Sequence, residues 1–289
     1  MKKLNFALLL AFAISAVLVS CGGGGGGGGG TAPATTTTTT STSTTTSSTT
    51  TTTTTSTTTS TPTYFGTKSP TEPKAVNDIV FNDGSATPYT SGLSLTDAQK
   101  NAAVAVIFYK DSTKTLGVGL KRSASSMQWC LNTANGYSKN IDTIQCTPSG
   151  SAGAYTFSSG DTDGSNNLAQ IATYLTSHGS TDDTGTAGNY PAFEYAKNYG
   201  STNGCTGAYA TGWYLPSIAE LYQIYNLRAN IDAAVALCGL TNTFSSAYFW
   251  SSSQYASNDY VAYVLDFVNG YCDNGYKGNG SPVCAVRAF

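Results

Sequence analysis

Charge is scarce in this chain. Lys, Arg, Asp and Glu make up only 10% of its 289 residues, and 14 basic residues against 16 acidic ones leave a formal net charge of −2. Proteins that bind nucleic acids need a patch of basic side chains to neutralise phosphates. Here the basic residues are scattered, so the composition argues against a nucleic-acid partner. No segment repeats at a fixed period either, which favours a single domain over residues 64–289.

Histidine is almost absent. The one imidazole, His178, lies in the polar stretch TSHGSTDDTG, so a histidine-rich metal site is excluded and a Ser-His-Asp triad would have to form around this residue. We expect a solvated loop histidine and no catalytic residue. Asp161-x-Asp163-Gly164 and Asp182-Asp183 lack the full spacing and the terminal glutamate of a helix-loop-helix calcium site. Turn formation explains them more simply, with cation binding as the alternative, and we expect no cofactor.

Long apolar runs are missing apart from the stretch from Leu4 to Val19, which follows two lysines. It is too short to favour a stable membrane-spanning helix and indicates an export signal. Its end, Leu18-Val19-Ser20-Cys21, resembles the bacterial lipobox. Residues 1–20 are therefore predicted to be a lipoprotein signal peptide, with acyl chains on Cys21 that anchor the protein in the cell envelope, at the surface of the outer membrane. A plain secretory signal is the alternative.

Apolar side chains are also almost absent from residues 21–63. Nine glycines, Gly22 to Gly30, run into a threonine/serine tract. This composition cannot offset its ordering entropy, so we expect a disordered stalk. A flexible coil of ~40 residues spans roughly 35 Å on average. The stalk would give reach to a folded head, and glycosylation of its hydroxyl groups is an open alternative.

The head has patterns typical of an α+β domain rich in loops. Thr96 and Gln99 have capping-box spacing ahead of the strand-like AAVAVIFYK, and LGVGLK is predicted to be its hairpin partner. Helical periodicity marks NNLAQIATYL, YPAFEYAKNY and PSIAELYQIYNLRANIDAAVAL, the last with a second capping box at Ser217 and Glu220. From Phe249 onward we expect short strands, with Asn-Gly turns at 269–270 and 274–275.

These motifs occur in an order that resembles a known family. TGWYLPSIAELYQIYN, then FWSSSQY, AYVLDFVNG, the lone Lys277 and VCAVRAF are similar to bacterial exported proteins with a C-type-lectin-like fold of the formylglycine-generating-enzyme type. Within that family, the nearest likeness is to spirochaetal lipoproteins whose C-terminal variable region is diversified by a retroelement. The resemblance covers about residues 102–289 and implies a rigid platform that presents variable side chains to a ligand.

The resemblance also assigns roles to particular positions. The framework it implies consists of Trp213, Leu215, Pro216, Glu220, Leu221, Trp250, Ser251, Ser252, Ser253, Phe267, Gly270, Lys277, Val286, Arg287 and Phe289. The positions that vary, and would contact a ligand, are Tyr255, Asn258, Asp259, Tyr260, Tyr271, Asp273, Asn274, Tyr276 and Asn279. The chain departs from the pattern at Cys284, where the family usually has arginine, and this puts diversification of this copy in doubt.

The residues themselves support a contact surface in the same region. Tyrosine offers a large and stiff contact, and Asn, Asp, Ser and Gly offer adaptable hydrogen bonds. Tyrosines in alternating strands can also be half-buried core residues. We expect that arrangement for Tyr263, beside Leu265 and Phe267, and we expect exposure for the four tyrosines of the predicted surface.

Six cysteines follow Cys21, and they permit fifteen pairings. We expect structural disulfides between neighbours in sequence, 130 with 146, 205 with 238 and 272 with 284. The sequence thus predicts a surface-anchored lipoprotein that binds a protein or glycan ligand without catalysis. The alternatives are an exported cysteine-dependent oxidoreductase or hydrolase, and a purely structural envelope or adhesion component.

Overall fold

The structure is a computed structural model that describes residues 63–186 and 188–289. All of these residues belong to one compact unit. The predicted signal peptide, Cys21 and the stalk lie outside the described residues. No helix in the described part of the chain is both long and apolar enough to cross a membrane.

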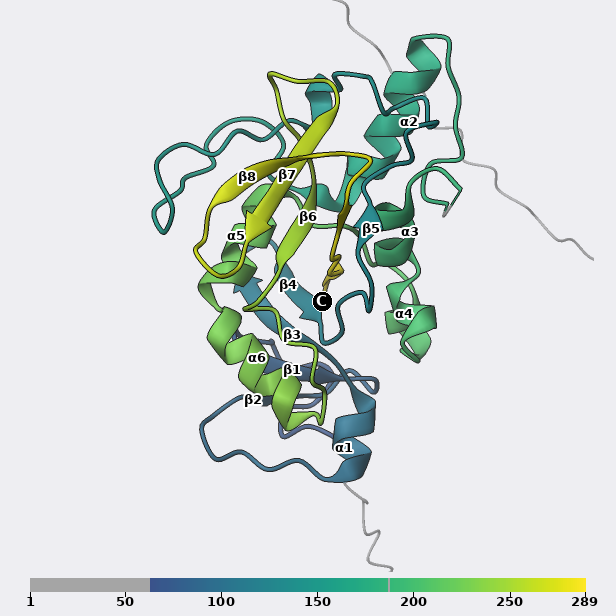
Figure 1. Cartoon of the computed structure of the whole chain (residues 1–289). Coiled ribbons are helices and arrows are strands. Elements are labelled where there is room, and N and C mark those ends of the chain that lie inside the picture. The colour runs from purple at the N-terminus through teal and green to yellow at the C-terminus, as the bar shows by residue number, and fades with distance from the viewer. Residues whose placement is uncertain (1–62, 187) are drawn as a thin grey trace, which may run out of the picture. The chain divides into compact units, whose positions relative to one another are not determined.

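A five-stranded antiparallel sheet, in the order β10-β4-β3-β1-β2, forms the base of the head (Figure 1). Its strands are β1 (Asp78–Phe81), β2 (Ala86–Pro88), β3 (Ala103–Lys110), β4 (Thr115–Gly119) and β10 (Val286–Ala288). The predicted hairpin is confirmed, because β3 and β4 pair antiparallel. The last strand, β10, pairs with β4, so the end of the chain closes the sheet.

Two smaller antiparallel sheets complete the β-structure. The first has the order β6-β7-β8, and the second pairs β5 with β9. Their strands are β5 (Met127–Gln128), β6 (Tyr248–Gln254), β7 (Val261–Asp266), β8 (Cys272–Tyr276) and β9 (Gly280–Ser281). In Figure 1, β7 and β8 lie in the upper part of the head, and β8 is the edge of its sheet.

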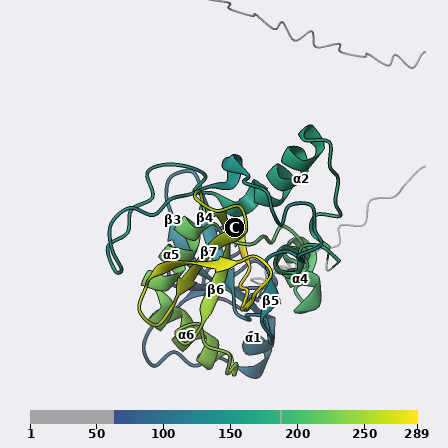
Figure 2. The same cartoon turned by 45° about the horizontal axis from the view of Figure 1, so that its top comes forward.

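Helices flank the β-structure on two sides, with α5 and α6 on one side and α2 and α4 on the other in both views (Figures 1 and 2). The α-helices are α1 (Asp97–Ala102), α2 (Asn167–Ser177), α3 (Pro191–Lys197), α4 (Tyr199–Thr202), α5 (Ile218–Asn226) and α6 (Arg228–Leu237). Short 3-10 helices occur at Asp142–Ile144, Gly164–Asn166 and Gly207–Ala210. Both predicted capping boxes are present, at the starts of α1 and α5. The predicted α+β class with small antiparallel sheets is confirmed.

The core consists of two apolar clusters that share the strands between them. On β7, Tyr263 and Leu265 belong to one cluster, whereas Ala262 and Val264 belong to the other. Because neighbouring strand residues point to opposite faces, both faces of β7 are buried. Full burial of one such side chain stabilises a fold by about 1.5–3 kcal/mol. The packing therefore fixes the position of β7, and β7 in turn positions the edge strand β8 that pairs with it. The burial predicted for Tyr263 is confirmed, since it is 4% exposed.

Two local predictions are wrong. The helix predicted over residues 216–237 is divided at Leu227, where the Arg228 guanidinium lies 3.9 Å from the centre of the Tyr225 ring and donates to the Tyr225 carbonyl at 2.9 Å. This bond engages the Tyr225 carbonyl near the end of α5, and the chain begins a separate helix, α6, at Arg228. Asn274-Gly275 is not a turn but part of β8. By contrast, residues 269–270 do form the turn between β7 and β8, and Gly270 has φ 76°.

The predicted disulfides are also wrong, because all six cysteines of the head are free. Pairing by order in the sequence ignores where the fold places each thiol. Cys130, for example, belongs to one core cluster and Cys146 to the other. Burial raises the pKa of Cys130 to about 12 and that of Cys146 to about 11. Very little thiolate, the reactive form, is therefore present at neutral pH.

Candidate functional site

The predicted contact residues lie on β8 and on the loops at its two ends. Eight of the nine are exposed, and Tyr255 is half-buried, with its ring 5.3 Å from that of Tyr263. Among the three most prominent tyrosines, Tyr260 is 45% exposed, Tyr271 56% and Tyr276 57%. Exposure is thus confirmed for these three, and wrong for Tyr255 because its ring packs against the core.

The register between β7 and β8 determines where these side chains point. Tyr263 pairs with Asn274 and Leu265 pairs with Cys272, so Asn274 lies on the same face as those core residues. Asp273 lies on the other face, opposite Val264. Because β8 is an edge strand, its polar side chains reach solvent on both faces. A ligand that wraps around this edge could contact both sets.

One group of contact residues gathers where the chain enters β7 and leaves β8. The amide of Lys277 donates to the Tyr260 carbonyl at 2.9 Å, and the amide of Asn279 donates to the Tyr276 carbonyl at 2.8 Å. The Tyr260 ring also contacts Tyr137, with 5.5 Å between the ring centres. Sequence reasoning missed Tyr137, which lies more than a hundred residues earlier and carries no local motif that points here.

The other group lies at the opposite end of β8, about 17 Å away for five residues of extended strand. It includes Tyr271 and Asp273, together with Tyr248 at the start of β6, which is 48% exposed and pairs with Asp266. The Asp266 carboxylate raises the pKa of the Tyr248 phenol, and Asp273 adds to this effect. Tyr248 therefore belongs to the surface, although the sequence did not single it out.

Two tryptophans support the surface from below. The Trp250 indole donates to the Met127 carbonyl at 2.8 Å, and the Trp129 indole donates to the Ser251 carbonyl at 2.9 Å. These two bonds cross-link β6 with the segment around β5. Trp250 also approaches β8 closely, because a Cβ on Gly275 would come within 3.0 Å of its ring. This close approach explains why glycine occurs in the middle of the strand.

The lone lysine of the motif is fully buried. The Lys277 ammonium donates to the carbonyls of Gly136 and Lys139, each at 3.0 Å, and lies 5.0 Å from the centre of the Trp129 ring. Burial lowers its pKa to about 8, and the interactions with Cys130 and Asp259 act in the opposite direction. Lys277 thus attaches the segment 136–139, which carries Tyr137, to the end of β8.

The entry to α5 contains a second buried ionisable group. Glu220 is 2% exposed and accepts hydrogen bonds from the amides of Ser217 at 2.9 Å and Gly164 at 3.1 Å, and from the Tyr214 hydroxyl at 2.9 Å. Burial raises the pKa of this carboxyl to about 7, although the hydrogen bonds act in the opposite direction. The carboxyl is a structural cap that joins the segment around Gly164 to the helix.

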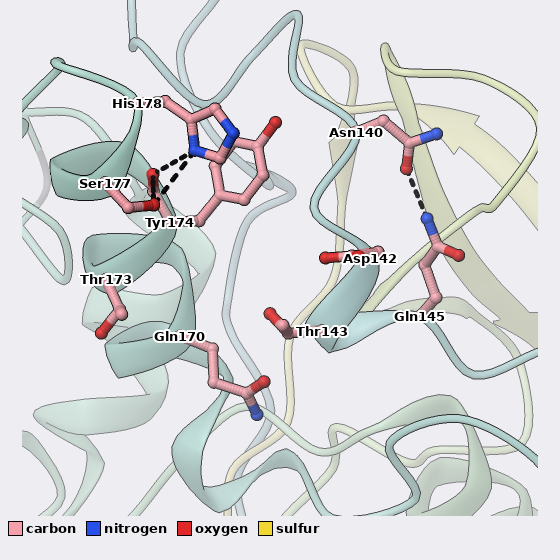
Figure 3. Close-up of a pocket in the computed structure, with 9 residues that line it drawn as sticks. All are labelled: Asn140, Asp142, Thr143, Gln145, Gln170, Thr173, Tyr174, Ser177 and His178. Carbon is pink, nitrogen blue, oxygen red and sulfur yellow. Dashed lines mark hydrogen bonds between the residues drawn. The ribbon is translucent and has the colours of Figure 1, made fainter. Parts of the chain in front are cut away.

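The sole histidine is exposed at the end of α2, as expected. Its ring stacks on Tyr174 with 4.0 Å between centres. Figure 3 shows both rings beside a pocket of about 640 Å³, with Gln170 and Thr173 on α2 facing Asp142 and Thr143. None of the nine predicted contact residues lines this pocket. It adjoins their surface, however, because the Asn140 side chain donates to the Ala256 carbonyl at 3.0 Å.

The first acidic motif acts in turns, because Asp161 accepts from the Asp163 amide at 3.0 Å and Asp163 accepts from the Ser165 amide at the start of a 3-10 helix. The turn explanation is wrong for Asp182, which accepts from the backbone amide of Asn135 at 2.6 Å and so connects two loops. Within residues 63–186 and 188–289, no group of three or more His, Cys, Asp or Glu side chains is placed to hold a metal ion.

Comparisons with known proteins identify the head. The structure is similar to that of a fimbrial protein from Bacteroides ovatus, with a TM-score of 0.49 and 17% sequence identity. The aligned region covers 75% of this chain and 49% of the fimbrial protein, so this chain spans about half the length of that protein. No curated protein matches. The Lcl C-terminal domain matches residues 123–287, more than half of the chain. The match ends within β10 and begins after β4, so an earlier segment supplies four strands of the base sheet. The chain therefore belongs to the family of Lcl C-terminal domains, a C-type-lectin-like family.

Proposed function

We propose that this protein is a surface-anchored lipoprotein whose head binds a protein or glycan ligand through the tyrosine surface, meaning the nine predicted contact residues together with Tyr137 and Tyr248. One observation carries the proposal. Eight large apolar or aromatic side chains of the head are exposed, and five of them, Tyr248, Tyr260, Val268, Tyr271 and Tyr276, lie between residues 248 and 276. Exposed side chains of this kind that gather in one region mark interaction sites.

The rigidity of the support agrees with this role. Tyr260, Tyr271 and Tyr276 lie next to strands whose inner faces are fully packed, and the loops at the ends of β8 are held by Lys277 and by the Asp266 carboxylate, which accepts from the Val268 amide at 2.8 Å. A preformed surface loses little conformational entropy when it binds. The same arrangement tolerates substitution of the outward side chains, because none of them fills the core.

The test begins with a ligand search, in which the full-length protein is screened against a random-peptide display library and a glycan array. Joint replacement of Tyr260, Tyr271 and Tyr276 by alanine should weaken binding of the selected ligand at least tenfold, because the large contacts are lost. The melting temperature should change by no more than about 2 °C, since exposed side chains contribute little to stability.

Tyr64→Ala is the matched control, because Tyr64 is a 38% exposed tyrosine outside the tyrosine surface. The affinity of this variant for the selected ligand should equal that of the wild type. An unaltered affinity in the triple variant would contradict the proposal. A head that binds no ligand saturably in either screen would favour a structural envelope or adhesion component. Cysteine-dependent catalysis receives no support from this geometry, because burial raises the pKa of the head thiols.

A further inference from the structure

Three of the four end strands of the two larger sheets are covered by another part of the chain. On β2, the Lys68 amide donates to the Ala86 carbonyl at 2.8 Å and the Ala86 amide donates back at 3.1 Å. On β10, Tyr214 and Val286 exchange two such bonds, at 2.8 and 3.0 Å. On β6, two amides donate to proline carbonyls outside the sheet, at 3.1 and 2.7 Å. These three edges are therefore closed to a further strand.

The outer edge of β8, the fourth end strand, is open (Figure 1). Within residues 63–186 and 188–289, no backbone group outside β7 and the following turn bonds to it, and β7 is the only helix or strand that packs along it extensively. Natural edges are usually protected by lysines, prolines, bulges or a covering segment. β8 contains no lysine or proline, and its five residue pairs with β7 run without a bulge. Its edge can therefore accept another strand.

The register shows which backbone groups of β8 face outward. The Lys277 amide donates to the Tyr260 carbonyl at 2.9 Å, and the Asp266 amide donates to the Tyr271 carbonyl at 3.0 Å. Bonded and non-bonded residue pairs alternate along two antiparallel strands, so the odd-numbered residues from 271 to 277 direct their backbone groups at β7. The even-numbered residues, 272, 274 and 276, direct theirs away from it.

Two outward groups at the centre and the end of β8 are free. The Asn274 carbonyl and the Tyr276 amide have no partner among the residues that the structure describes. The other groups of these two residues are engaged locally, since the Asn274 amide donates to the Asp273 carboxylate and the Tyr276 carbonyl accepts from the Asn279 amide, both at 2.8 Å. A free acceptor and a free donor at this spacing match the backbone of an extended polypeptide, which repeats one donor and one acceptor per residue. The edge therefore favours a polypeptide over a glycan.

The charges around the edge favour a basic partner. Asp259 and Asp273 are exposed, and Lys277, the only basic residue from 255 to 279, is fully buried. A second copy of β8 on this edge would bring like carboxylates together, and such pairs across two strands are destabilising. A segment with a lysine or an arginine beside Asp273 is attracted instead. It would also draw this carboxylate away from the Asn274 amide, which could then donate to the added strand.

We propose that an extended segment of a polypeptide ligand pairs with the outer edge of β8 as an additional strand, with a basic residue beside Asp273. Main-chain hydrogen bonds then hold the segment, and the neighbouring tyrosines contact its side chains. This inference rests on the proposed function and deepens it, because it assigns the ligand to the polypeptide class and states how the head holds it.

The test titrates the pentapeptide acetyl-Thr-Val-Lys-Val-Thr-amide into the ¹⁵N-labelled full-length protein. The Tyr276 amide signal should shift saturably, and its hydrogen exchange should slow at least tenfold, because this amide gains an acceptor. The Gly275 amide faces β7 and is the internal control, so its exchange should change far less. The same peptide N-methylated at every residue has no backbone donor and should bind at least tenfold more weakly.

Two variants of β8 test the pairing from the side of the protein. Asn274→Pro replaces an outward amide by a ring, which an edge strand tolerates but an added strand does not, so the pentapeptide should bind at least tenfold more weakly. Asn274→Ala keeps the amide and should lose no more than threefold, which separates the backbone from the side chain. Asp273→Lys should prefer the peptide that carries glutamate in place of its lysine.

Three results would overturn the inference: no saturable shift of the Tyr276 amide, equal binding of the N-methylated peptide, or equal affinity in a folded Asn274→Pro variant. If the screens recover only a glycan ligand, this inference fails while the proposed function stands. The triple tyrosine variant keeps the backbone of β8, so it should still bind the pentapeptide while it loses the selected ligand. If it keeps its affinity for the selected ligand, the proposed function fails although the edge pairs with the pentapeptide.

Discussion

At the scale of single residues, two of the buried ionisable groups of the head, Glu220 and Lys277, have clear structural tasks. Glu220 accepts three hydrogen bonds at the start of α5, and Lys277 donates to backbone carbonyls beneath the tyrosine surface. A buried charge is tolerated only when it is hydrogen-bonded or paired. Both residues belong to the ordered motif, so part of that motif maintains the fold.

Glu220 should make stability depend on pH. Its carboxyl has a folded-state pKa of about 7 against an ordinary value of 4.5, so the folded protein binds this proton more tightly than the unfolded chain. The free energy of unfolding should therefore fall as the pH rises from about 4.5 through 7, by on the order of 3 kcal/mol.

Glu220→Gln should remove this dependence, because glutamine keeps the acceptor for the two amides and mimics the protonated acid. Urea unfolding at pH 5 and pH 8 measures the effect. The variant should equal the wild type at pH 5 and exceed it at pH 8. Equal losses in the two proteins between these pH values would show that other groups cause the dependence.

At the scale of elements, local signals predicted most of what the structure contains. The capping boxes at Thr96 and Ser217 mark true helix starts, and Pro191 opens α3, because caps depend on neighbours within one turn. The strand conformation of Asn274-Gly275 depends on Trp250, which packs against Gly275 only in the folded chain. The break at Leu227 accompanies the contact between Arg228 and Tyr225, for which the sequence contains no capping motif. The cysteines were mispredicted for the same reason, since pairing depends on distances that sequence order does not contain.

The candidate surface shows the same limit. Tyr260, Tyr271 and Tyr276 could be predicted as exposed because polar and glycine residues surround them. Tyr137 could not, since it reaches the surface only through the bonds that Lys277 makes to residues 136–139.

Lys277 connects the end of β8 with residues 136–139, so its replacement should destabilise both. Lys277→Met keeps the length of the side chain but leaves the carbonyls of Gly136 and Lys139 without this donor. We expect a loss of about 2–4 kcal/mol in the free energy of unfolding, measured by urea denaturation at pH 7. Hydrogen exchange should rise first in residues 136–139. Lys139→Met, on the same segment, tests whether any lysine there has this effect, and a similar loss in that control would contradict the assignment.

At the scale of the whole molecule, the predicted anchor and stalk would determine where the head acts. Cys21→Ser should abolish acylation and release the protein from the membrane fraction, because each buried methylene of an acyl chain adds about 0.8 kcal/mol to membrane binding. Detergent phase partitioning and fractionation of the expressing bacterium measure the shift. Ser20→Ala, which keeps a small residue before the cysteine, should remain anchored. If Cys21→Ser stays with the membrane, the apolar run of residues 4–19 or another contact holds the protein there. If it is released while the head still binds its ligand in solution, the anchor serves only to place the tyrosine surface at the membrane.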